Sequence, residues 1–583
     1  MTSQHEPSPP PVSGAPGTGT PPSGTPETEP AQRTRRGSRL LWPLRQLDLL
    51  LWAVAAWYAG AQSGRIELSL TLAVLALVVL LPRRLPGGAS ERLRTRLLLG
   101  LAVACLTQAA GPDLVRFTTT DWVRSWNVFH YYLGAEYYDE LGYHDLYRAA
   151  LVADSEGTDG EGAGVWRSID RVRDLETYRV EPREEELAEY RPLEAFSPER
   201  WSAFRADVAI LADGMPAGSF RNVFTDRGYN ATPFWTFLGA VLTKLLPARH
   251  LLTYKLLLAL DLLLLAAALA LVKRTFGTRA LALVLLLFAL SPVNLGRLVG
   301  GFLQYDWFSA FVLGFCWYPR RQPVAAAAGM AYAALARVFP VVFVAAGVLP
   351  LAWAWWRHGQ RPTVFHRRFL AAYVLFGVVG LGLGSLTPRG PAAWLDFARI
   401  IEHHSHEHVF GQRRVGLEHL FTRDLDQPLE ETSISERREA HRGREGLVAL
   451  STAALLGLWL WVIRRRRSAD GQLLGLVPFF SLTVSSRYYW SYLAMLPLLG
   501  QRAGPEGSEE RPRELQRWVS AGQVAVFAGF YLYSQRVPDR YAAYWWLNLL
   551  LLVFLLTLLL GYLVTDGRSK PGDETRREAG PQN

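Results

Sequence analysis

Side chains that could do chemistry gather in a few short stretches of a chain that is otherwise largely apolar. The first stretch, residues 118–147, reads TTTDWVRSWNVFHYYLGAEYYDELGYHDLY and follows directly after an apolar segment. Asp121 lies just beyond that segment among aromatic residues, where partial desolvation makes a carboxylate a better proton acceptor. Thr-Thr-Asp is also a common helix start. Asp121 is therefore a general base or an N-cap, and one residue can serve both roles.

A second acid, Asp306, lies in the stretch GGFLQYDWF at the expected outer end of another apolar segment. Acidic residues near membrane depth are costly and often functional. Asp306 is expected either to bind substrate or to form an ion pair with Arg297 or Arg337. Asp261, in contrast, lies among leucines in the middle of an apolar segment, where hydrogen bonding between helices is the favoured role.

Arginines lie at or near the expected outer ends of three apolar segments: Arg297, Arg337 in LARVFP and Arg487 in SSRYYW. Arginine offers a planar fork of donors that matches phosphate oxygens. A single arginine at such a place commonly extends to the lipid headgroups. The recurrence favours a site for a lipid phosphate or pyrophosphate at the bilayer surface.

Histidines and carboxylates crowd the stretch IIEHHSHEHVFGQRR. Side chains at this spacing can bind Zn²⁺ or another divalent metal, although the spacing matches no strong zinc signature. The alternative is a solvated loop in which one or two histidines line a pocket. The candidate metal ligands are His403, His404, His406 and His408, and a divalent metal is the only cofactor that the sequence suggests.

Long apolar segments must position all these residues. The chain has 583 residues, a formal net charge of +10 and a mean hydropathy of +0.08, which would suit a soluble protein if the residues were spread evenly. Apolar runs of bilayer length exclude a soluble globule. They predict an all-α polytopic membrane protein with about 14 transmembrane helices (11–14), near residues 46–62, 66–82, 97–111, 251–272, 280–296, 304–318, 323–336, 338–356, 369–387, 446–463, 471–485, 488–501, 517–534 and 543–564.

The distribution of charge predicts the orientation of these segments. With a cytoplasmic N-terminus, every strongly basic short loop falls on the cytoplasmic side, as the positive-inside rule requires. Two long loops, about 112–250 and 388–445, then lie outside. Residues 112–228 carry 23 acidic residues against 13 arginines, a net charge of −10. The apolar segment 234–246 is short for a span, and counting it would invert all later loops, so we expect an interfacial or re-entrant helix there.

The first outer loop is expected to begin with an amphipathic helix. Trp126, Phe129, Tyr132, Leu133 and Tyr137 recur at three- and four-residue spacing. Such an apolar stripe can lie along the membrane surface.

Several classes of protein are disfavoured by composition. The only cysteines, Cys105 and Cys316, both lie in apolar stretches, which argues against a disulfide framework. Nothing in the chain indicates binding of nucleic acid. Residues 1–39 hold nine prolines and almost no large apolar residue, and we expect a disordered tail.

These motifs resemble those of the GT-C superfamily of integral-membrane glycosyltransferases. The run Asp121, Tyr131-Tyr132, Ala135, Gly142, Asp145-Leu146-Tyr147 is similar to the opening of the bacterial polyprenyl-phosphate-mannose-dependent mannosyltransferases. Arg337-Val338-Phe339-Pro340 resembles the K-x-x-P helix of that branch, and residues 485–492 resemble its late S-P-x-x-W-x-x-Y motif. The resemblance covers roughly residues 95–500.

The resemblance implies transfer of a sugar, commonly mannose or arabinose, from a polyprenyl-phosphate donor to a lipid-linked glycan, lipid or protein on the outer face of the membrane. Asp121 would deprotonate the acceptor hydroxyl while the anomeric carbon inverts. Arg297, Arg337 and Arg487 would hold the departing lipid phosphate. The expected substrate-binding residues are Asp306, Tyr131, Tyr132, Tyr488 and Trp490.

The chain departs from the pattern of that branch in several places. Arg337 stands where lysine is more usual, and no proline follows Ser485. Two additional N-terminal spans and a long acidic first loop are also unusual. The expected organisation is a cytoplasmic tail (1–39), two transmembrane helices with a basic loop (40–96), a GT-C-like catalytic module (97–500), C-terminal transmembrane helices (501–564) and a second cytoplasmic tail (565–583), in a bacterial inner (plasma) membrane.

Two other functions compete with a glycosyltransferase. A transporter or lipid or glycan flippase would also have many spans with intramembrane charges, but no inverted repeat or paired broken helices are found between the two halves of the chain. A non-catalytic scaffold would leave the acids and arginines at the outer helix ends without a purpose.

Overall fold

The structure is a computed structural model of the chain. It describes residues 47–81, 88–157, 168–213, 215, 217–246, 251–424, 427–430, 432–504 and 510–566. The chain divides into two compact units, Met1–Leu50 and Leu51–Asn583. In the first unit only the first turn of α2 is described. The tail expected at 1–39, and all but the first two residues of the tail expected at 565–583, lie outside the described residues.

Helices dominate the described chain, which confirms an all-α protein. It is 75% helical, and the described strands form only two short antiparallel pairs. The N-terminal helices are α2 (Leu47–Gln62), α3 (Arg65–Leu80) and α4 (Gly88–Thr119). α4 is longer than its apolar stretch because its first turn is held by ion pairs from Glu91 to Arg279 and Arg517. Three loops expected in the cytoplasm therefore meet at one end of the bundle.

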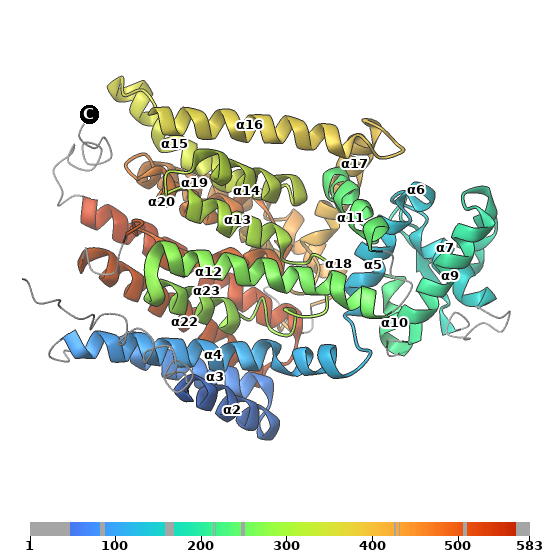
Figure 1. Ribbon diagram of the computed structural model, residues 1–583, viewed down its shortest axis with the longest axis horizontal. Coiled ribbons are helices and arrows are strands. Elements are labelled where there is room, and N and C mark those ends of the chain that lie inside the picture. The colour runs from blue at the N-terminus through green and yellow to red at the C-terminus, as the bar shows by residue number, and fades with distance from the viewer. Residues whose placement is uncertain are drawn as a thin grey trace, which may run out of the picture. The chain divides into compact units, whose positions relative to one another are not determined.

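The first long loop folds into a lobe of its own at the opposite end of the bundle (Figure 1). Its helix α5 (Ser125–Glu136) begins where the aromatic stripe begins. Phe129, Tyr132, Leu133 and Tyr137 are buried against protein, and only Trp126 is exposed, at 37%. The stripe thus packs on α9 and α11 and does not lie along the membrane surface. The lobe contains α6 (Tyr138–Leu141), α7 (Leu146–Glu156), β1 (Arg171–Arg173), β2 (Val180–Pro182), α8 (Arg183–Leu187), η3 (Pro192–Glu194), α9 (Pro198–Asp213) and α10 (Ala217–Val223).

A short helix joins the lobe to the bundle. α11 (Pro233–Leu245) starts at the N-cap Thr232, whose side chain accepts a hydrogen bond from the Trp235 backbone N–H. Its 13 residues give a length of about 20 Å, which is less than the roughly 30 Å hydrocarbon core of a bilayer. The length agrees with the expected interfacial or re-entrant helix.

The two spans expected at 251–272 and 280–296 form one long element with a break. α12 (Leu251–Leu290) contains Gly277 with a φ of 87°, a conformation that is unfavourable for any residue with a side chain. The element thus behaves as two helices that meet at this glycine. The next helices are α13 (Asp306–Trp317), α14 (Pro323–Ala336), α15 (Val341–His358), α16 (Val364–Gly384) and α17 (Ala392–His408).

The C-terminal part of the chain departs most from the expected spans. The segment expected at 471–485 is divided at Gly475 into two short helices, and the segment expected at 488–501 is a 3₁₀ helix whose residues 490–498 are buried inside the protein. The elements here are β3 (Arg414–Val415), η4 (Leu417–Thr422), α18 (Ile434–Arg442), α19 (Glu445–Ile463), α20 (Ser468–Leu474), α21 (Leu476–Leu482), β4 (Ser485–Ser486), η5 (Arg487–Leu498), α22 (Glu510–Arg536) and α23 (Arg540–Asp566).

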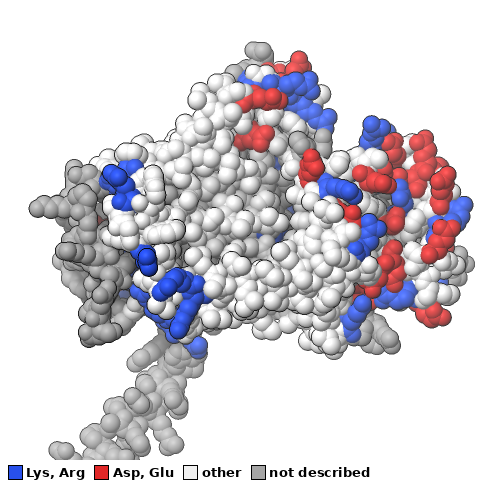
Figure 2. Space-filling model, turned by 90° about the horizontal axis from the view of Figure 1, so that it is seen from above, with Lys and Arg blue, Asp and Glu red and all other residues white. Residues whose placement is uncertain are grey.

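Six of the described helices are long and apolar enough to cross a bilayer: Glu91–Thr119, Leu252–Leu290, Val341–His358, Val364–Gly384, Glu445–Ile463 and Arg540–Val564. Their outward faces are apolar; on α16, for example, Val374 and Val378 are 62% and 61% exposed. Soluble proteins rarely expose such surfaces. Figure 2 shows, on the described part of one face, a wide zone without charged side chains between two charged ends. The chain is a multi-pass membrane protein.

Candidate active site

A large cavity lies where the lobe meets the bundle. Its volume is about 1210 Å³. The wall draws on α5, on the loop before α11, on α17 and on the ladder formed by β3 and β4. Ten arginines but only three carboxylates line it: Arg124, Arg227, Arg297, Arg337, Arg413, Arg414, Arg438, Arg442, Arg487 and Arg540, with Asp226, Glu418 and Glu445. A cavity of this composition attracts anions.

The three arginines selected from the sequence all line this one cavity. Arg297 lies in the connection after α12, Arg337 directly follows α14, and Arg487 begins η5. None of the three forms an ion pair with a described carboxylate. In each of them the buried Nε has no hydrogen-bond partner. Since a buried unpartnered donor is costly, this arrangement suits an anionic ligand.

Arg337 is the most enclosed of these groups, with 7% of the residue exposed. Its guanidinium carbon lies 5.1 Å from the ring centroid of Tyr131 and 5.4 Å from that of Trp235. One terminal nitrogen donates to the Ala336 carbonyl oxygen at 3.0 Å. The two rings fix the plane of the guanidinium and favour its charge.

Arg487 and Arg297 are anchored by other aromatic residues. Arg487 Nη1 lies 3.1 Å from the hydroxyl of Tyr544, which belongs to α23. The guanidinium carbon of Arg297 lies 5.7 Å from the ring centroid of Tyr488. Tyr131 and Tyr488, both expected to bind substrate, therefore line the cavity beside the arginines.

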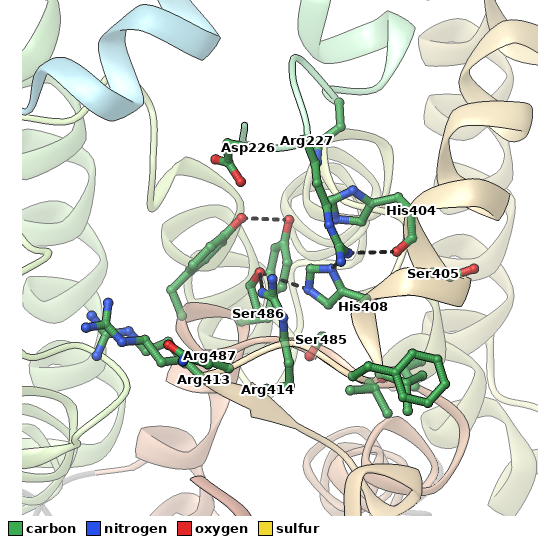
Figure 3. Close-up of a pocket in the computed structure, with 18 of the residues that line it drawn as sticks. Asp226, Arg227, His404, Ser405, His408, Arg413, Arg414, Ser485, Ser486 and Arg487 are labelled. Carbon is green, nitrogen blue, oxygen red and sulfur yellow. Dashed lines mark hydrogen bonds between the residues drawn. The ribbon is translucent and has the colours of Figure 1, made fainter. Parts of the chain in front are cut away.

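Arg413 and Arg414 were missed by the sequence analysis. β3 pairs with β4 so that Arg414 faces Ser486, and Arg414 Nη1 donates to Ser486 Oγ at 2.8 Å (Figure 3). Burial, with the neighbouring Arg227, lowers the pKa of Arg414 to about 9, so it remains charged at neutral pH. Arg413 has a φ of 56°, an unfavourable conformation for a long side chain. The only sequence signal was the arginine pair that ends the histidine-rich stretch.

The acid that lines the cavity beside the lobe is Asp226, which was not predicted either. Its Oδ2 accepts a hydrogen bond from Trp126 Nε1 at 2.9 Å and lies 4.0 Å from His130 Nε2. Its side chain remains 42% exposed. It lies in an Asp-Arg-Gly sequence just before the apolar segment that becomes α11, which was the available signal.

Asp121 occupies a different place. It is exposed and does not line the cavity. The N-cap interpretation is wrong, because α5 begins four residues later and its N-cap position, Arg124, makes no side-chain capping bond.

Three of the expected substrate-binding residues are buried in the protein and outside the cavity wall. Asp306 Oδ2 accepts hydrogen bonds from Trp235 Nε1 at 3.0 Å and from the Tyr332 hydroxyl at 2.7 Å, and it pairs with neither Arg297 nor Arg337 within 4.0 Å. Tyr132 packs on Tyr254, with ring centroids 4.7 Å apart. Trp490 Nε1 donates to Ser485 Oγ at 3.1 Å and so supports β4.

The histidines divide between two places. His408 is buried, with Nδ1 2.9 Å from Arg227 Nη1 and Nε2 3.2 Å from Ser486 Oγ, and the carbonyl oxygen of His404 accepts from the same Arg227 nitrogen at 3.2 Å. Figure 3 shows Arg227 reaching toward both. His403 is exposed and stacks on Tyr178. The side chain of His406 lies outside the described residues.

The environment of His404 and His408 does not favour a metal. Burial, together with nearby arginines, holds the pKa of both imidazoles well below the usual range, so both are neutral at pH 7. A cation would lie among guanidinium groups there. Within the described part of the chain, no three histidine, cysteine or acidic side chains come together in a way that could hold a metal ion.

A family model matches a segment of the chain that contributes much of the cavity wall. Residues 231–486 match the model of glycosyltransferase family 87. This is a family of GT-C-type membrane glycosyltransferases, so the resemblance seen in the motifs is confirmed over that segment. The match supports a membrane glycosyltransferase. Neither curated proteins nor solved structures give a significant match.

The matched segment begins at α11 and ends in β4. It includes Arg297, Arg337 and Arg414 and excludes Asp226, Arg227 and the whole lobe. The family match therefore covers part of the arginine cluster together with Glu418 and Glu445. The first long loop adds Asp226 with Arg124 and Arg227.

Proposed function

We propose that the protein transfers a sugar, mannose or another hexose or pentose, from a polyprenyl-phosphate donor to a lipid-linked, glycan or protein acceptor on the extracytoplasmic face of a bacterial plasma membrane. The observation that carries this proposal is the cavity of about 1210 Å³ in which Arg297, Arg337 and Arg487 converge. In a glycosyltransferase of this type the group that leaves is a lipid phosphate, and an arginine-lined cavity at the end of a membrane bundle suits such a group.

The arginines would act mainly in the transition state. As the bond between the anomeric carbon and the phosphate oxygen breaks, the electron pair and negative charge pass to the phosphate. Guanidinium groups that are already held in place stabilise this charge without reorganisation. Arg337, between Tyr131 and Trp235, is the most buried of them.

The base of this reaction is assigned to Asp226, in place of the Asp121 expected from the sequence. Asp226 would remove the proton from the acceptor hydroxyl as its oxygen bonds to the anomeric carbon from the face opposite the phosphate, which inverts that carbon. Trp126 and His130 position the carboxylate, and its partial exposure leaves it open to an acceptor. Asp121 does not line the cavity.

A pair of matched variants tests this assignment. The full chain, purified in detergent, would be assayed for release of polyprenyl phosphate from a polyprenyl-phosphate mannose donor with membrane glycolipid extract as acceptor. Asp226→Asn is expected to lower the rate by about 10²–10⁴-fold, and Asp121→Asn is expected to retain most of it. If Asp121→Asn loses activity and Asp226→Asn retains it, Asp121 is the base. If both variants retain activity, neither acid is the base.

The assignment as a glycosyltransferase has an independent test. Mass spectrometry of envelope glycans and glycolipids would compare a strain that lacks this gene with its parent. Loss of one hexose or pentose from a glycan supports the proposal and identifies the sugar. An unchanged glycan profile together with a transport defect would favour the alternative, a transporter or a lipid or glycan flippase.

A further inference from the structure

A second cavity of about 560 Å³ adjoins the main one. The two share three wall residues, Arg227, Phe410 and Arg438. The rest of the second wall comes from α17, from the start of α18 and from β1 with the turn that follows it. That turn belongs to the lobe, outside the segment that matches the family. The second cavity is therefore a feature that this chain's long first loop adds to the site.

We propose that this second cavity binds the sugar acceptor, and that the acceptor carries an anionic group, a phosphate or a carboxylate, close to the sugar that is glycosylated. The proposal rests on the function proposed above. It adds the chemical class of the acceptor and the place where the acceptor lies.

Charge gives the first argument. Four arginines line the second cavity, against one carboxylate: Arg173, Arg179, Arg227 and Arg438, with Glu402. Arg173 and Arg227 are engaged by backbone oxygens and by His408. Arg179 lines the same cavity and is exposed. The main cavity already holds ten arginines against three carboxylates. One lipid phosphate cannot compensate so much positive charge, so a second anionic ligand is expected.

The aromatic wall gives the second argument. Tyr178 and His403 stack with ring centroids 5.9 Å apart and an interplanar angle of 16°. Tyr178 adopts a φ of 61°, and such strain persists in non-glycine residues mainly where function requires it. The ring of Tyr178, from the lobe, lies against His403 of α17. A flat aromatic surface beside charged donors is typical of a polar-ligand pocket, and it suits the face of a sugar ring.

The link to the base gives the third argument. Arg173 Nε donates to the backbone oxygens of Thr225 at 3.2 Å and Asp226 at 2.9 Å. A further nitrogen of Arg173 donates to the Tyr178 backbone oxygen. One side chain thus joins the turn that lines the second cavity to the residue assigned as the base. An acceptor bound by the turn would present its hydroxyl next to Asp226.

Direct binding measurements test the proposal with the purified full chain in detergent. Isothermal titration calorimetry would use glucose 6-phosphate as the anionic sugar probe, glucose as its neutral counterpart and a short-chain polyprenyl phosphate as the donor-side probe. Glucose 6-phosphate is expected to bind at least about tenfold more tightly than glucose, since a hydrogen-bonded ion pair is lost with the phosphate. Arg179→Gln should weaken glucose 6-phosphate binding by about tenfold and leave polyprenyl phosphate binding unchanged.

Two further variants make the result specific. Arg297→Gln, in the main cavity, should have the opposite pattern, with weaker binding of polyprenyl phosphate and unchanged binding of glucose 6-phosphate. Arg399→Gln, on α17 but outside both cavities, is the control and should change neither. Equal binding of glucose and glucose 6-phosphate, or full binding by Arg179→Gln, would overturn the proposal. Failure of the chain to transfer sugar would overturn the proposed function, and the binding data would still decide on the second cavity.

Discussion

At the scale of single residues, the position of Arg337 between two aromatic rings explains why arginine suits this position better than lysine. A planar guanidinium can stack on Tyr131 and Trp235 and still present donors to a phosphate, whereas an ammonium group on a flexible stem does not stack in this way. Arg337→Lys is therefore expected to lower kcat/KM for the polyprenyl-phosphate donor by about 10–100-fold. Steady-state kinetics of the purified variant measure this.

A surface substitution of the same type provides the control for Arg337→Lys. Arg399 is exposed and pairs with Asp396, so Arg399→Lys should leave kcat/KM unchanged. An Arg337→Lys variant that is as active as the parent would show that only the charge of Arg337 matters.

Buried neutral histidines make the stability of the protein sensitive to acid. His419 lies fully buried in η4, and burial lowers its pKa to about 4; His404 and His408 shift in the same direction. Between the unfolded pKa of about 6.5 and the lowered folded values, the unfolded chain binds more protons than the folded chain. The free energy of unfolding should therefore fall as the pH drops below about 6.5, by on the order of 2 kcal/mol at pH 5 for His419 alone.

Thermal unfolding of the purified protein between pH 7.5 and pH 5 measures this loss. The transition temperature should decrease over that range in the parent and decrease less in His419→Gln, whose side chain does not titrate. A transition temperature that is constant from pH 7.5 to pH 5, or a fall that is identical in the variant, would refute the role of His419.

At the scale of elements, the short ladder of β3 and β4 holds Arg414 and Ser486 at the cavity. Gly416 follows β3, and its backbone N–H donates to Asn548 Oδ1 at 2.8 Å. A Cβ atom at this position would lie 2.1 Å from the Thr483 carbonyl oxygen. Gly416→Ala should therefore separate the two strands and abolish transfer, or prevent folding.

Fluorescence-detected size-exclusion chromatography and the transfer assay together distinguish these two effects of Gly416→Ala. Gly457→Ala, in α19, is the matched control, because the added methyl group meets no atom within 4 Å apart from its own stretch of helix backbone. Equal activity of both variants would show that the ladder is not needed to place Arg414.

The same elements show what periodicity and apolar length could predict. α14 was expected at 323–336 and has those bounds, and α19 lies within one residue of the expected 446–463. Both are apolar runs ended by arginine or proline, so local sequence defines them. η5 was expected as a span, but its apolar residues face protein and not lipid, and composition alone does not distinguish these environments.

The candidate site divides in the same way. Arg297, Arg337 and Arg487 were found because charged residues at the ends of apolar runs are visible in one dimension. Asp226 and Arg414 were not found, because their partners are distant in sequence: Trp126 lies 100 residues from Asp226, and Ser486 lies 72 residues from Arg414. No local pattern encodes such contacts.

At the scale of the whole molecule, the sorting of charge predicts which end of the bundle is outside the cell. The only cysteines, Cys105 and Cys316, are both buried, so single cysteines can be introduced as reporters. Ser202→Cys, exposed in the lobe, should react in intact cells with a membrane-impermeant maleimide. Gln360→Cys, exposed between α15 and α16, should react only after the cells are permeabilised.

Labelling of Gln360→Cys, but not of Ser202→Cys, in intact cells would show that the protein has the opposite orientation in the membrane. It would also move the proposed transfer reaction to the cytoplasmic face. Reaction of both in intact cells would contradict any placement of the two loops on opposite sides.

The attachment of α23 to the cavity has a consequence for biosynthesis. Asn548 holds Gly416 and also donates to the Arg414 backbone oxygen at 2.9 Å, and Arg540 and Tyr544 of the same helix lie at the arginine cluster. At 5–20 residues per second, the ribosome needs roughly 7–27 s to proceed from Arg414 to Asn548, 134 residues later. Throughout that interval the nascent chain holds an unfinished array of guanidinium groups at the bilayer. Insertion of α23 is therefore the step that completes the cavity wall.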